Sequence, residues 1–386
     1  MNELLKEIAN EYGTPVYVYF ESVLEERALR VLKTFEGVKF LPTVAVKANN
    51  NPHLLSILSN IGFGADVLGE GELYACKLAG ISPEKIIWNG NGKTKEQQKY
   101  MEEQHIGYVN VDSVEEFEEL WKNSETNMEL FLRVNPDVDP KTHPYISTGL
   151  KIHKFGMSFQ QAEALLSKYR GKISGFHIHI GSQILEVAPF KEAIEKTINL
   201  AKKYEIKKIN IGGGWGVRYK EEEKELDLEK YRKVIIPLLQ NFELVLNEVG
   251  RFIFAPAGVL LTKVVRIKET EYKNFIVVDT GMNHLIRPSL YGAFHKVENV
   301  VSKSTKKIIA DVVGPLCETG DFIVKEITLP RPAPGDIFVV YNVGAYGYSM
   351  ANNYNGTLRP AEILVKKDGS YELIRKRESI VDLYKF

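Results

Sequence analysis

Short apolar runs alternate with amphipathic stretches along most of the chain, from about residue 21 to residue 249. The amphipathic stretches carry apolar residues at helical spacing, and most follow a Ser, Thr, Asp or Asn that can cap a helix. Repeated alternation of strand and helix is typical of βα units around a parallel sheet. The apolar runs are KFLPTVAV (39–46), FGADV (63–67), KIIW (85–88), GYVNV (107–111), MELFLRV (128–134), ISGFHIHI (173–180), KKINI (207–211) and FELVLNEV (242–249).

Eight such repeats predict an α/β fold of the (β/α)8 TIM-like barrel type, which needs eight strand–helix units and roughly 250 residues. A doubly wound parallel sheet is the weaker alternative. The glycine-rich segment GGGWG at 212–216 lacks the G-x-G-x-x-G spacing of a dinucleotide-binding turn, and no helical pattern follows it directly.

The pattern changes after about residue 256. Val- and Ile-rich runs such as FIVVD, KIIADVV and DIFVVYNV follow one another without helical patterns between them, and turns such as PAPGD separate them. We therefore expect a second, all-β domain of the sandwich or barrel type. The early run TPVYVYF (14–20) could join it as an extra strand, so the predicted domains are 25–256 for the barrel, and 1–24 with 257–386 for the β-domain.

Composition excludes several classes of protein. The 386 residues are 44% apolar and 26% charged, which excludes disorder of the whole chain. Lys and Arg together number 50, as do Asp and Glu, so the formal net charge is +0. Nothing draws the surface as a whole toward nucleic acid or an anionic membrane, and an anionic ligand must be bound at a local site.

The cysteine content and the first residues indicate a cytoplasmic protein. Cys76 and Cys317 are too few for a disulfide framework, which favours a reducing compartment. The start, MNELLKEIANEY, has the pattern of an amphipathic helix, not of a secretion signal. No apolar run approaches the roughly 18 residues of a membrane span, so we expect no bilayer crossing.

Polar residues close the predicted barrel strands, at the end of a barrel where chemistry gathers. Lys47 follows an apolar strand in TVAVKANNN, where desolvation would favour the neutral amine that bonds to carbonyl groups. For an isolated lysine just past a strand, a solvated surface position is the more common explanation. The complete set is Lys47, Asp66, Asn89, Arg133, His177, His179, Gly212 to Gly214 and Glu248.

Two histidines and a glycine triplet suggest binding functions. His177 and His179 are two positions apart in a predicted strand, so both should point to one side. They could ligate a metal, but no third ligand is apparent, and ring stacking or hydrogen bonding fits as well. The triplet 212–214 lets backbone amides approach an anion, with Ser182 as a hydroxyl donor, although tight turns use the same residues.

The β-domain has three polar clusters of its own, in which Tyr and Asn are interleaved with Gly. Turn chemistry alone can explain one such cluster, but three in one domain favour a binding function. They are DTGMNHLIRPSLYGAFH (279–295), GPLCETGD (314–321) and GAYGYSMANNYNGT (344–357).

Nine motifs in order give the chain a strong resemblance to the diaminopimelate decarboxylases. These are a branch of the alanine-racemase-like, fold type III enzymes that use pyridoxal 5'-phosphate. The resemblance runs over nearly the whole chain. The motifs are AVKANNN, GFGADVLGEGEL, THPYISTGLKIHKFG, HIHIGSQI, INIGGGWG, EVGR, DTGMNHLIRPSLY, GPLCETGD and GAYGYSM.

The resemblance implies a role for each candidate that binds the cofactor. Lys47 matches the lysine that bonds covalently to pyridoxal 5'-phosphate, His179 the imidazole stacked on its ring, and Glu248 the carboxylate paired with its ring nitrogen. Asp66 is a further cofactor-binding candidate at a strand end, and no metal is expected. The residues that match the family's phosphate site are Ser182, Gly213, Gly214, Gly250, Arg251 and Tyr346.

The resemblance also implies a substrate site and a homodimer. Cys317 matches a residue that the second subunit of the dimer places opposite Lys47. We thus expect catalytic roles for Lys47, Cys317, His179 and Glu248. The substrate-binding candidates are Arg251, Arg287, Tyr291, Glu318 and Tyr346.

Two positions depart from the family's pattern. Val249 replaces the proline usual in the E-P-G-R motif, and Gly69–Glu70 stand where a Ser or Thr is common before G-E-L. Neither departure removes a functional side chain, so each affects only local geometry.

The residue types suit this chemistry independently. A carboxylate such as Glu248 keeps a pyridine nitrogen protonated, and Cys317, as a thiol at neutral pH, can donate a proton. Two arginines with an acidic residue suit a substrate that carries a distant carboxylate and ammonium, which argues against ornithine or arginine as substrate. Without the motifs, a structural ion pair would be the likelier role of Arg287 and Glu318.

We therefore expect a decarboxylase that converts meso-2,6-diaminopimelate to L-lysine and CO2, the last step of lysine biosynthesis. The alternative is a related enzyme that acts on another carboxylated amine, such as carboxynorspermidine or a carrier-bound glutamyl group. A non-enzymatic pyridoxal-phosphate carrier would lack the β-domain, and a racemase would have a catalytic tyrosine in place of Cys317.

Overall fold

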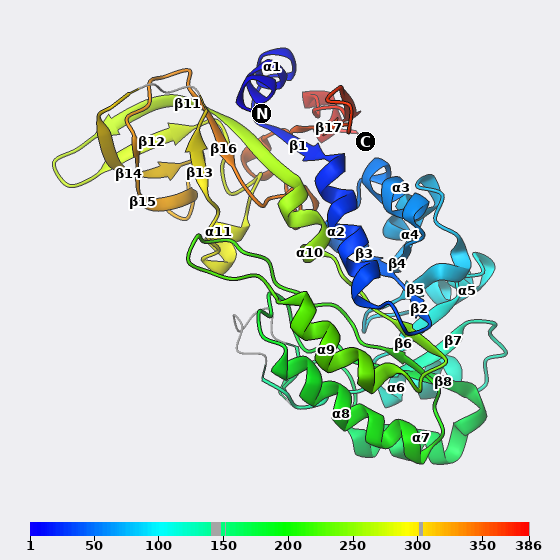
Figure 1. Ribbon diagram of the computed structural model, residues 1–386. Coiled ribbons are helices and arrows are strands. Elements are labelled where there is room, and N and C mark those ends of the chain that lie inside the picture. Colours follow the sequence, from blue (N-terminus) through cyan, green and yellow to red (C-terminus); the bar gives the residue numbers. More distant parts are fainter. Residues whose placement is uncertain (140–147, 151, 301–303, 386) are drawn as a thin grey trace. The chain divides into compact units, whose positions relative to one another are not determined.

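The computed structural model describes residues 1–139, 148–150, 152–300 and 304–385, and it divides into two compact units (Figure 1). The barrel unit comprises Glu25–Val217 and Lys224–Phe252, and the β unit comprises Met1–Leu24, Arg218–Glu223 and Ile253–Phe386. The short segment 218–223 thus belongs to the β unit, although barrel residues flank it in sequence. Part of the THPYISTGLKIHKFG motif, residues 142–147 and 151, lies outside the described residues.

A parallel sheet forms the barrel unit, in the strand order β2-β10-β9-β8-β7-β6-β5-β4-β3. Its nine segments fill the eight predicted positions, because Pro42 divides the first predicted strand in two; β2 pairs with β10, and β3 pairs with β4. The predicted barrel is confirmed. Its strands are β2 (Phe40–Leu41), β3 (Thr43–Ala45), β4 (Gly64–Val67), β5 (Ile86–Trp88), β6 (Tyr108–Val111), β7 (Glu129–Arg133), β8 (Ile173–His177), β9 (Lys208–Asn210) and β10 (Leu244–Leu246).

Val249 closes the sheet where the family's motif has proline. A parallel bridge joins it to Val44, its amide donates to the Thr43 carbonyl at 3.2 Å, and its carbonyl accepts from the Ala45 amide at 3.4 Å. Proline has no amide hydrogen and could not make the first of these bonds. In this chain the departure therefore supplies a hydrogen bond that closes the barrel.

Helices connect the barrel strands, and their starts carry the predicted caps. The side chains of Asn51, Thr94, Ser113, Ser158 and Asp227 each accept a backbone amide at a helix N-terminus. Gly69, by contrast, precedes its helix without a side-chain cap. The helices are α2 (Glu21–Thr34), α3 (Pro52–Ile61), α4 (Glu70–Leu78), α5 (Lys95–Glu103), α6 (Val114–Glu116, continued by a π-helical turn to Trp121), α7 (Phe159–Tyr169), α8 (Ala188–Lys203), α9 (Leu228–Leu239) and α10 (Arg251–Phe254).

A mixed sheet forms the β unit, in the order β15-β14-β12-β11-β1-β17-β18, while β16 pairs with both β11 and β13. The early run joins this sheet, since β1 is antiparallel to β11 and parallel to β17. The strands are β1 (Val16–Phe20), β11 (Gly258–Glu269), β12 (Asn274–Val278), β13 (Val297–Asn299), β14 (Lys307–Val313), β15 (Phe322–Pro330), β16 (Ile337–Val340), β17 (Ala361–Val365) and β18 (Tyr371–Arg375).

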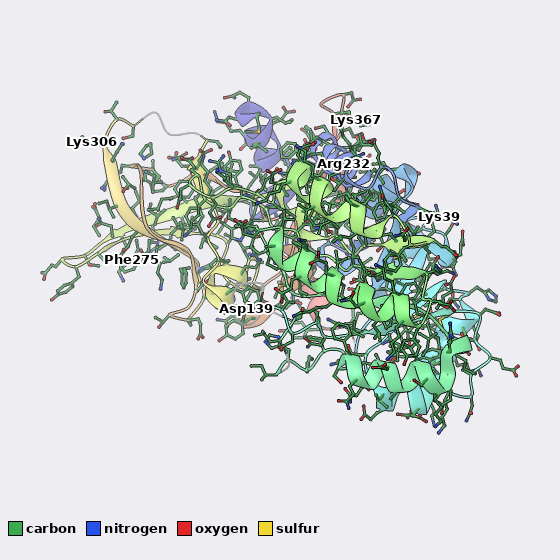
Figure 2. All side chains as sticks on the ribbon, turned by 60° about the horizontal axis from the view of Figure 1, so that its bottom comes forward. Lys39, Asp139, Arg232, Phe275, Lys306 and Lys367 are labelled. Atoms are coloured by element: carbon green, nitrogen blue, oxygen red, sulfur yellow. The ribbon has the colours of Figure 1, made fainter. Side chains whose placement is uncertain are left out.

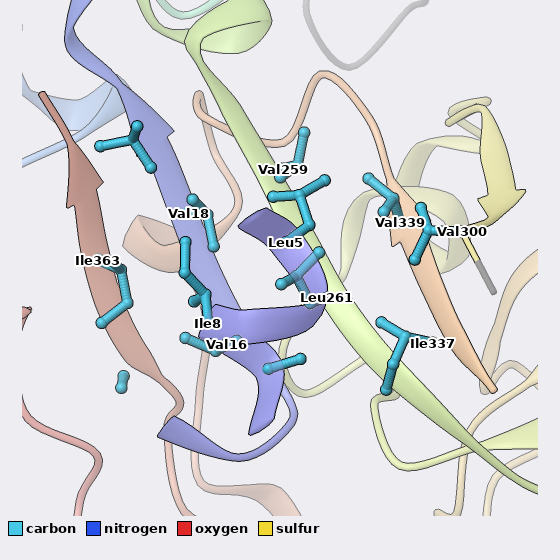
Figure 3. Packing of buried hydrophobic residues seen from close by; sticks show 13 residues of the cluster. Leu5, Ile8, Val16, Val18, Val259, Leu261, Val300, Ile337, Val339 and Ile363 are labelled. Carbon is cyan, nitrogen blue, oxygen red and sulfur yellow. The ribbon is translucent and has the colours of Figure 1, made fainter. Parts of the chain in front are cut away.

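The N-terminal helix α1 (Asn2–Tyr12) packs its apolar stripe on this sheet (Figure 3). Leu5 and Ile8 are fully buried in a cluster with Val16, Val18 and other strand residues. Two further short helices, α11 (Arg287–Tyr291) and α12 (Ile380–Leu383), were not predicted. The first of them forms where Pro288 occupies a first-turn position, for which its fixed φ suits it.

Charged side chains lie on the surface of both units, as the balanced composition predicts. Lys39, Lys306 and Lys367, labelled in Figure 2, are all exposed. Within the described parts of the chain, no helix combines the length and apolar character that a membrane span requires.

Candidate active site

Lys47 lies in a 3-10 turn (Val46–Ala48) that directly follows β3. Val46 and Ala48 are buried, whereas Lys47 is exposed in this single chain. Gly250 packs closely against this turn. A Cβ atom at position 250 would lie 2.8 Å from the Ala48 Cβ, so a glycine is required there.

The side chain of Glu248 is held through one of its two oxygens. Oε1 accepts hydrogen bonds from the amide nitrogens of Asn89 (2.9 Å), Asn110 (2.9 Å) and Asn210 (2.7 Å), and His177 Nε2 lies 3.3 Å from it. Glu248 itself is 5% exposed. All of these contacts from the described residues are made to Oε1 and none to Oε2. The carboxylate is therefore fixed in orientation, with one oxygen directed elsewhere.

The two buried carboxyl groups of the site, Glu248 and Asp66, have pKa values shifted in opposite directions. Burial alone would raise the pKa of Glu248, but its contact with His177 and the charge of Lys47 lower the pKa overall, so that Glu248 stays ionised. Burial and the neighbouring Glu248 charge raise the pKa of Asp66 to about 7, although Asn89 donates a hydrogen bond to Asp66. One carboxyl group is thus fixed as an anion, and the other titrates near neutral pH.

His179 lies just beyond the end of β8, and its ring is held as a neutral imidazole. The Gly213 amide donates to Nδ1 at 3.2 Å, which places the ring proton on Nε2. Burial and the charge of Lys47 lower the pKa of His179 well below its usual range. His177 contacts Glu248 instead. Among the residues that the structure describes, no group of three or more His, Cys, Asp or Glu side chains could hold a metal ion.

The glycine turn after β9 lies against the end of β10. A Cβ at Gly213 would come within 2.1 Å of the Glu248 carbonyl oxygen, and the Gly212 amide donates to Asn210 Oδ1 at 3.0 Å. Arg251, 7% exposed, donates from Nε and Nη2 to the Ser182 hydroxyl at 3.2 and 2.9 Å. The structure therefore brings the predicted phosphate residues Ser182 and Arg251 together.

In the β unit, the helix α11 carries two of the substrate candidates. Arg287, 5% exposed, begins this helix and Tyr291 ends it, one turn away. The Arg287 Nη1 lies 2.8 Å from Nε2 of the buried His295. Tyr346 is partly buried and has a left-handed backbone with φ of 58°.

Cys317 and Glu318 lie exposed in the loop between β14 and β15. Tyr354 donates to Glu318 at 3.2 Å. The buried Asp321 ties this loop down, because its carboxylate accepts the amides of Met282 (2.6 Å) and Leu316 (2.7 Å). The proton-donor candidate is thus mounted on an anchored but solvent-exposed loop.

The sequence prediction missed several of these residues. Asn110 and Asn210 donate to Glu248, His295 contacts Arg287, and Asp321 anchors the Cys317 loop. Their sequence signal is weak: Asn110 is a polar residue between Val109 and Val111, and Asn210 ends a three-residue strand that begins with Lys208.

Comparisons with known proteins agree with this arrangement. A family model described as "Pyridoxal-dependent decarboxylase, pyridoxal binding domain" matches residues 21–255. The curated diaminopimelate decarboxylase of Aquifex aeolicus is 43% identical over 388 residues, which cover 97% of this chain and 92% of that protein. The chain belongs to the diaminopimelate decarboxylase family. The Zymomonas mobilis member is 41% identical over 98% of this chain and 94% of its own.

Solved structures of the family share the whole fold. The diaminopimelate decarboxylase of Helicobacter pylori, complexed with L-lysine, has a TM-score of 0.91 at 36% identity and covers 98% of both chains. A lysine/ornithine decarboxylase of Vibrio vulnificus, complexed with cadaverine, has a TM-score of 0.83 at 21% identity, covering 94% of this chain and 97% of its own, and shows the fold alone.

The cofactor of this family is pyridoxal 5'-phosphate, and the barrel unit has groups that fit it. The ionised Glu248 has one oxygen outside its asparagine contacts, the buried Arg251 and Ser182 lie together, and glycines keep the adjacent turn free of side chains. These are a partner for a protonated ring nitrogen and a cradle for an anion.

Proposed function

We propose that this chain decarboxylates meso-2,6-diaminopimelate to L-lysine and CO2, the last step of lysine biosynthesis. The observation that carries the proposal is the ionised Glu248, held by asparagines from three strand ends in the unit that also bears Lys47. The family relationship supports the substrate, since relatives of this length and identity are diaminopimelate decarboxylases.

In the proposed site, Lys47 would hold the cofactor through a covalent bond, and Glu248 would keep its ring nitrogen protonated. When bound, the cofactor would supply an electron sink for the bond that breaks as CO2 leaves. The neutral His179 would pack on the cofactor ring, and Asp66 lies near Asn89 and Glu248. The proposed phosphate residues are Ser182, Gly213, Gly214, Gly250, Arg251 and Tyr346.

In the proposed substrate site, Arg287 binds the carboxylate that remains in the product, because a guanidinium fork matches a carboxylate. Glu318 binds the distal ammonium, and Arg251, Tyr291 and Tyr346 complete the site. Cys317 returns a proton to the carbon that lost CO2.

We further propose that Cys317 acts across a homodimer, so that each site combines the barrel unit of one copy with the Cys317 loop of the other. The exposure of Cys317 within one chain supports this, because a proton donor to a carbanion needs shelter from water. The two free cysteines also suit the reducing cytoplasm.

The test is a product assay on the purified protein loaded with pyridoxal 5'-phosphate. We expect meso-2,6-diaminopimelate to give equal amounts of CO2 and L-lysine, and carboxynorspermidine to give little CO2. Preferential release of CO2 from carboxynorspermidine would instead establish the alternative function.

A further inference from the structure

Two side chains of the β unit, His295 and Tyr219, contact the guanidinium of Arg287. Its Nη1 lies 2.8 Å from His295 Nε2, and its Cζ lies 4.9 Å from the ring centre of Tyr219. Tyr219 and His295 contact each other edge to face, with ring centres 5.4 Å apart at an interplanar angle of 80°. Arg287 thus contacts an imidazole edge and an aromatic face.

The hydrogen-bond chain fixes the protonation state of His295. An arginine side chain has only donors, so Nε2 must accept from Nη1 and carries no proton. The other ring nitrogen, Nδ1, lies 2.8 Å from the Tyr341 carbonyl, which can only accept, so Nδ1 carries the proton. His295 is therefore neutral, and it is fully buried.

His295 and Tyr219 are neutral, so their contacts orient the guanidinium without adding a negative charge to it. A carboxylate in place of His295 would compete with a substrate carboxylate for the same guanidinium. The imidazole occupies one donor edge, and the face of Tyr219 sets the plane of the group. Tyr219 can contact Arg287 and His295 because it lies in the segment 218–223, which belongs to the β unit although barrel residues flank it in sequence.

We propose that His295, together with Tyr219, is a positioning residue that sets substrate specificity by aiming Arg287 at the distal carboxylate. The inference rests on the proposed function, in which Arg287 binds that carboxylate. Beyond that function, the proposal states that selection for a substrate with a distal carboxylate depends on the hydrogen bond that the neutral His295 accepts from Arg287.

Two ligands isolate this contact. L-Lysine and cadaverine differ only in the carboxylate that Arg287 is proposed to bind. The ratio of their inhibition constants against diaminopimelate decarboxylation therefore measures the carboxylate contact, while a general disturbance of the site weakens both ligands alike.

A matched pair of variants separates the two ring nitrogens of His295. In His295→Asn the side-chain amide replaces Nδ1 and keeps the bond to Tyr341, but it cannot reach Arg287. In His295→Gln the amide oxygen replaces Nε2 and still accepts from Arg287. We expect His295→Asn to reduce the preference for lysine over cadaverine about tenfold, as for a lost hydrogen bond to a charged group, and His295→Gln to keep it within about threefold.

Three further proteins complete the experiment. Tyr219→Leu, which leaves His295 in place, should reduce the preference about threefold through the lost ring contact. Lys296→Gln changes the neighbouring residue, whose surface pairs with Glu221 and Glu298 contribute little, and should leave the preference unchanged. In an Arg287→Ala background, His295→Asn should have no additional effect on the ratio.

The outcomes distinguish this proposal from the function on which it rests. If Arg287→Ala leaves the ratio unchanged, the assignment of Arg287 to the carboxylate is wrong. If Arg287→Ala abolishes the preference but His295→Asn does not reduce it, or weakens lysine and cadaverine equally, the positioning role of His295 is overturned. Circular dichroism and cofactor absorption establish that each variant is folded. If His295→Asn does not fold, the ratio of the two inhibition constants in Tyr219→Leu tests the positioning of Arg287 instead.

Discussion

The barrel unit buries the carboxylate proposed to pair with the cofactor, whereas the β unit exposes the thiol proposed to donate a proton. In the barrel unit, Glu248 is 5% exposed, and its oxygen receives amide donors from Asn89, Asn110 and Asn210. In the β unit, Arg287 is equally buried, but Cys317 and Glu318 lie exposed in one loop.

The difference shows what each kind of chemistry requires. A carboxylate that must stay charged in a desolvated place needs several donors, and one chain can supply all of them. A proton donor must be covered only during the reaction, so another chain can provide the cover. The comparison predicts that changes at Lys47 and around Glu248 affect the cofactor, whereas changes at Arg287 and Cys317 affect substrate binding and proton transfer.

The largest effect should come from removing the amine at the barrel's mouth. Lys47→Ala should abolish the visible absorption of the bound cofactor and reduce turnover more than about a thousandfold, because no other group can replace the covalent bond. Lys95→Ala, at an exposed lysine on α5, is the matched control. Full activity of the Lys47 variant would show that Lys47 does not hold the cofactor.

Arg287→Ala tests the other side of the comparison. The substrate carboxylate would lose a buried partner, so kcat/KM for diaminopimelate should fall about 100-fold, equivalent to about 3 kcal/mol. Cofactor absorption should not change, since Arg287 is proposed to contact the substrate and not the cofactor. Arg266→Ala, at an exposed position of β11, should match the unchanged protein. Altered cofactor absorption in the Arg287 variant would contradict the proposal that Arg287 contacts only the substrate.

Asn210→Leu should weaken cofactor binding, although Asn210 is not among the residues proposed to contact the cofactor. Asn210 donates to Glu248 and accepts the Gly212 amide, so its loss raises the pKa of Glu248 and loosens the glycine turn. We expect about tenfold weaker binding of pyridoxal 5'-phosphate, measured by titration of the apoprotein, and a similar fall in kcat. Asn199→Leu on the exposed side of α8 is the control. An unchanged cofactor affinity would show that Asn210 supports only the fold.

The smallest effect concerns the stability of the β unit at acid pH. Burial lowers the pKa of His284 to about 4, and the ring contacts Thr280 and the Leu358 carbonyl. Between its usual pKa of about 6.5 and about 4, the unfolded chain binds a proton that the folded chain does not. The free energy of unfolding should therefore fall as the pH falls through this range, by at most about 1.4 kcal/mol per pH unit.

Urea unfolding at several pH values measures this slope. His284→Gln should reduce it, whereas His53→Gln at an exposed position should not. Equal slopes in all three proteins would mean that His284 is protonated in the folded state.

The sequence predicted the barrel well because each strand is a short apolar run bounded by turns and helix caps. It could not show that Pro42 divides the first strand, or that residues 218–223 belong to the β unit, since both depend on distant partners. Among site residues, the polar groups at strand ends could be proposed as one set, because parallel strands share one end. Asn110 and Asn210 lie within runs that were interpreted only as apolar strands. The roles of His295 and Asp321 depend on their contacts with Arg287 and with the Cys317 loop, which the sequence does not show.

Mixing two inactive proteins tests the central claim, that the cofactor chemistry of one chain is completed by the exposed loop of another. Lys47→Ala and Cys317→Ala proteins are combined under conditions that let subunits exchange, and native mass spectrometry of differently tagged chains confirms the exchange. In a mixed dimer, one site receives both defects and the other receives none. Random pairing makes half of the dimers mixed, so activity should recover to about a quarter of that of the unchanged protein. Exchange without recovered activity would contradict the account, because residues from one chain would leave every site with one defect.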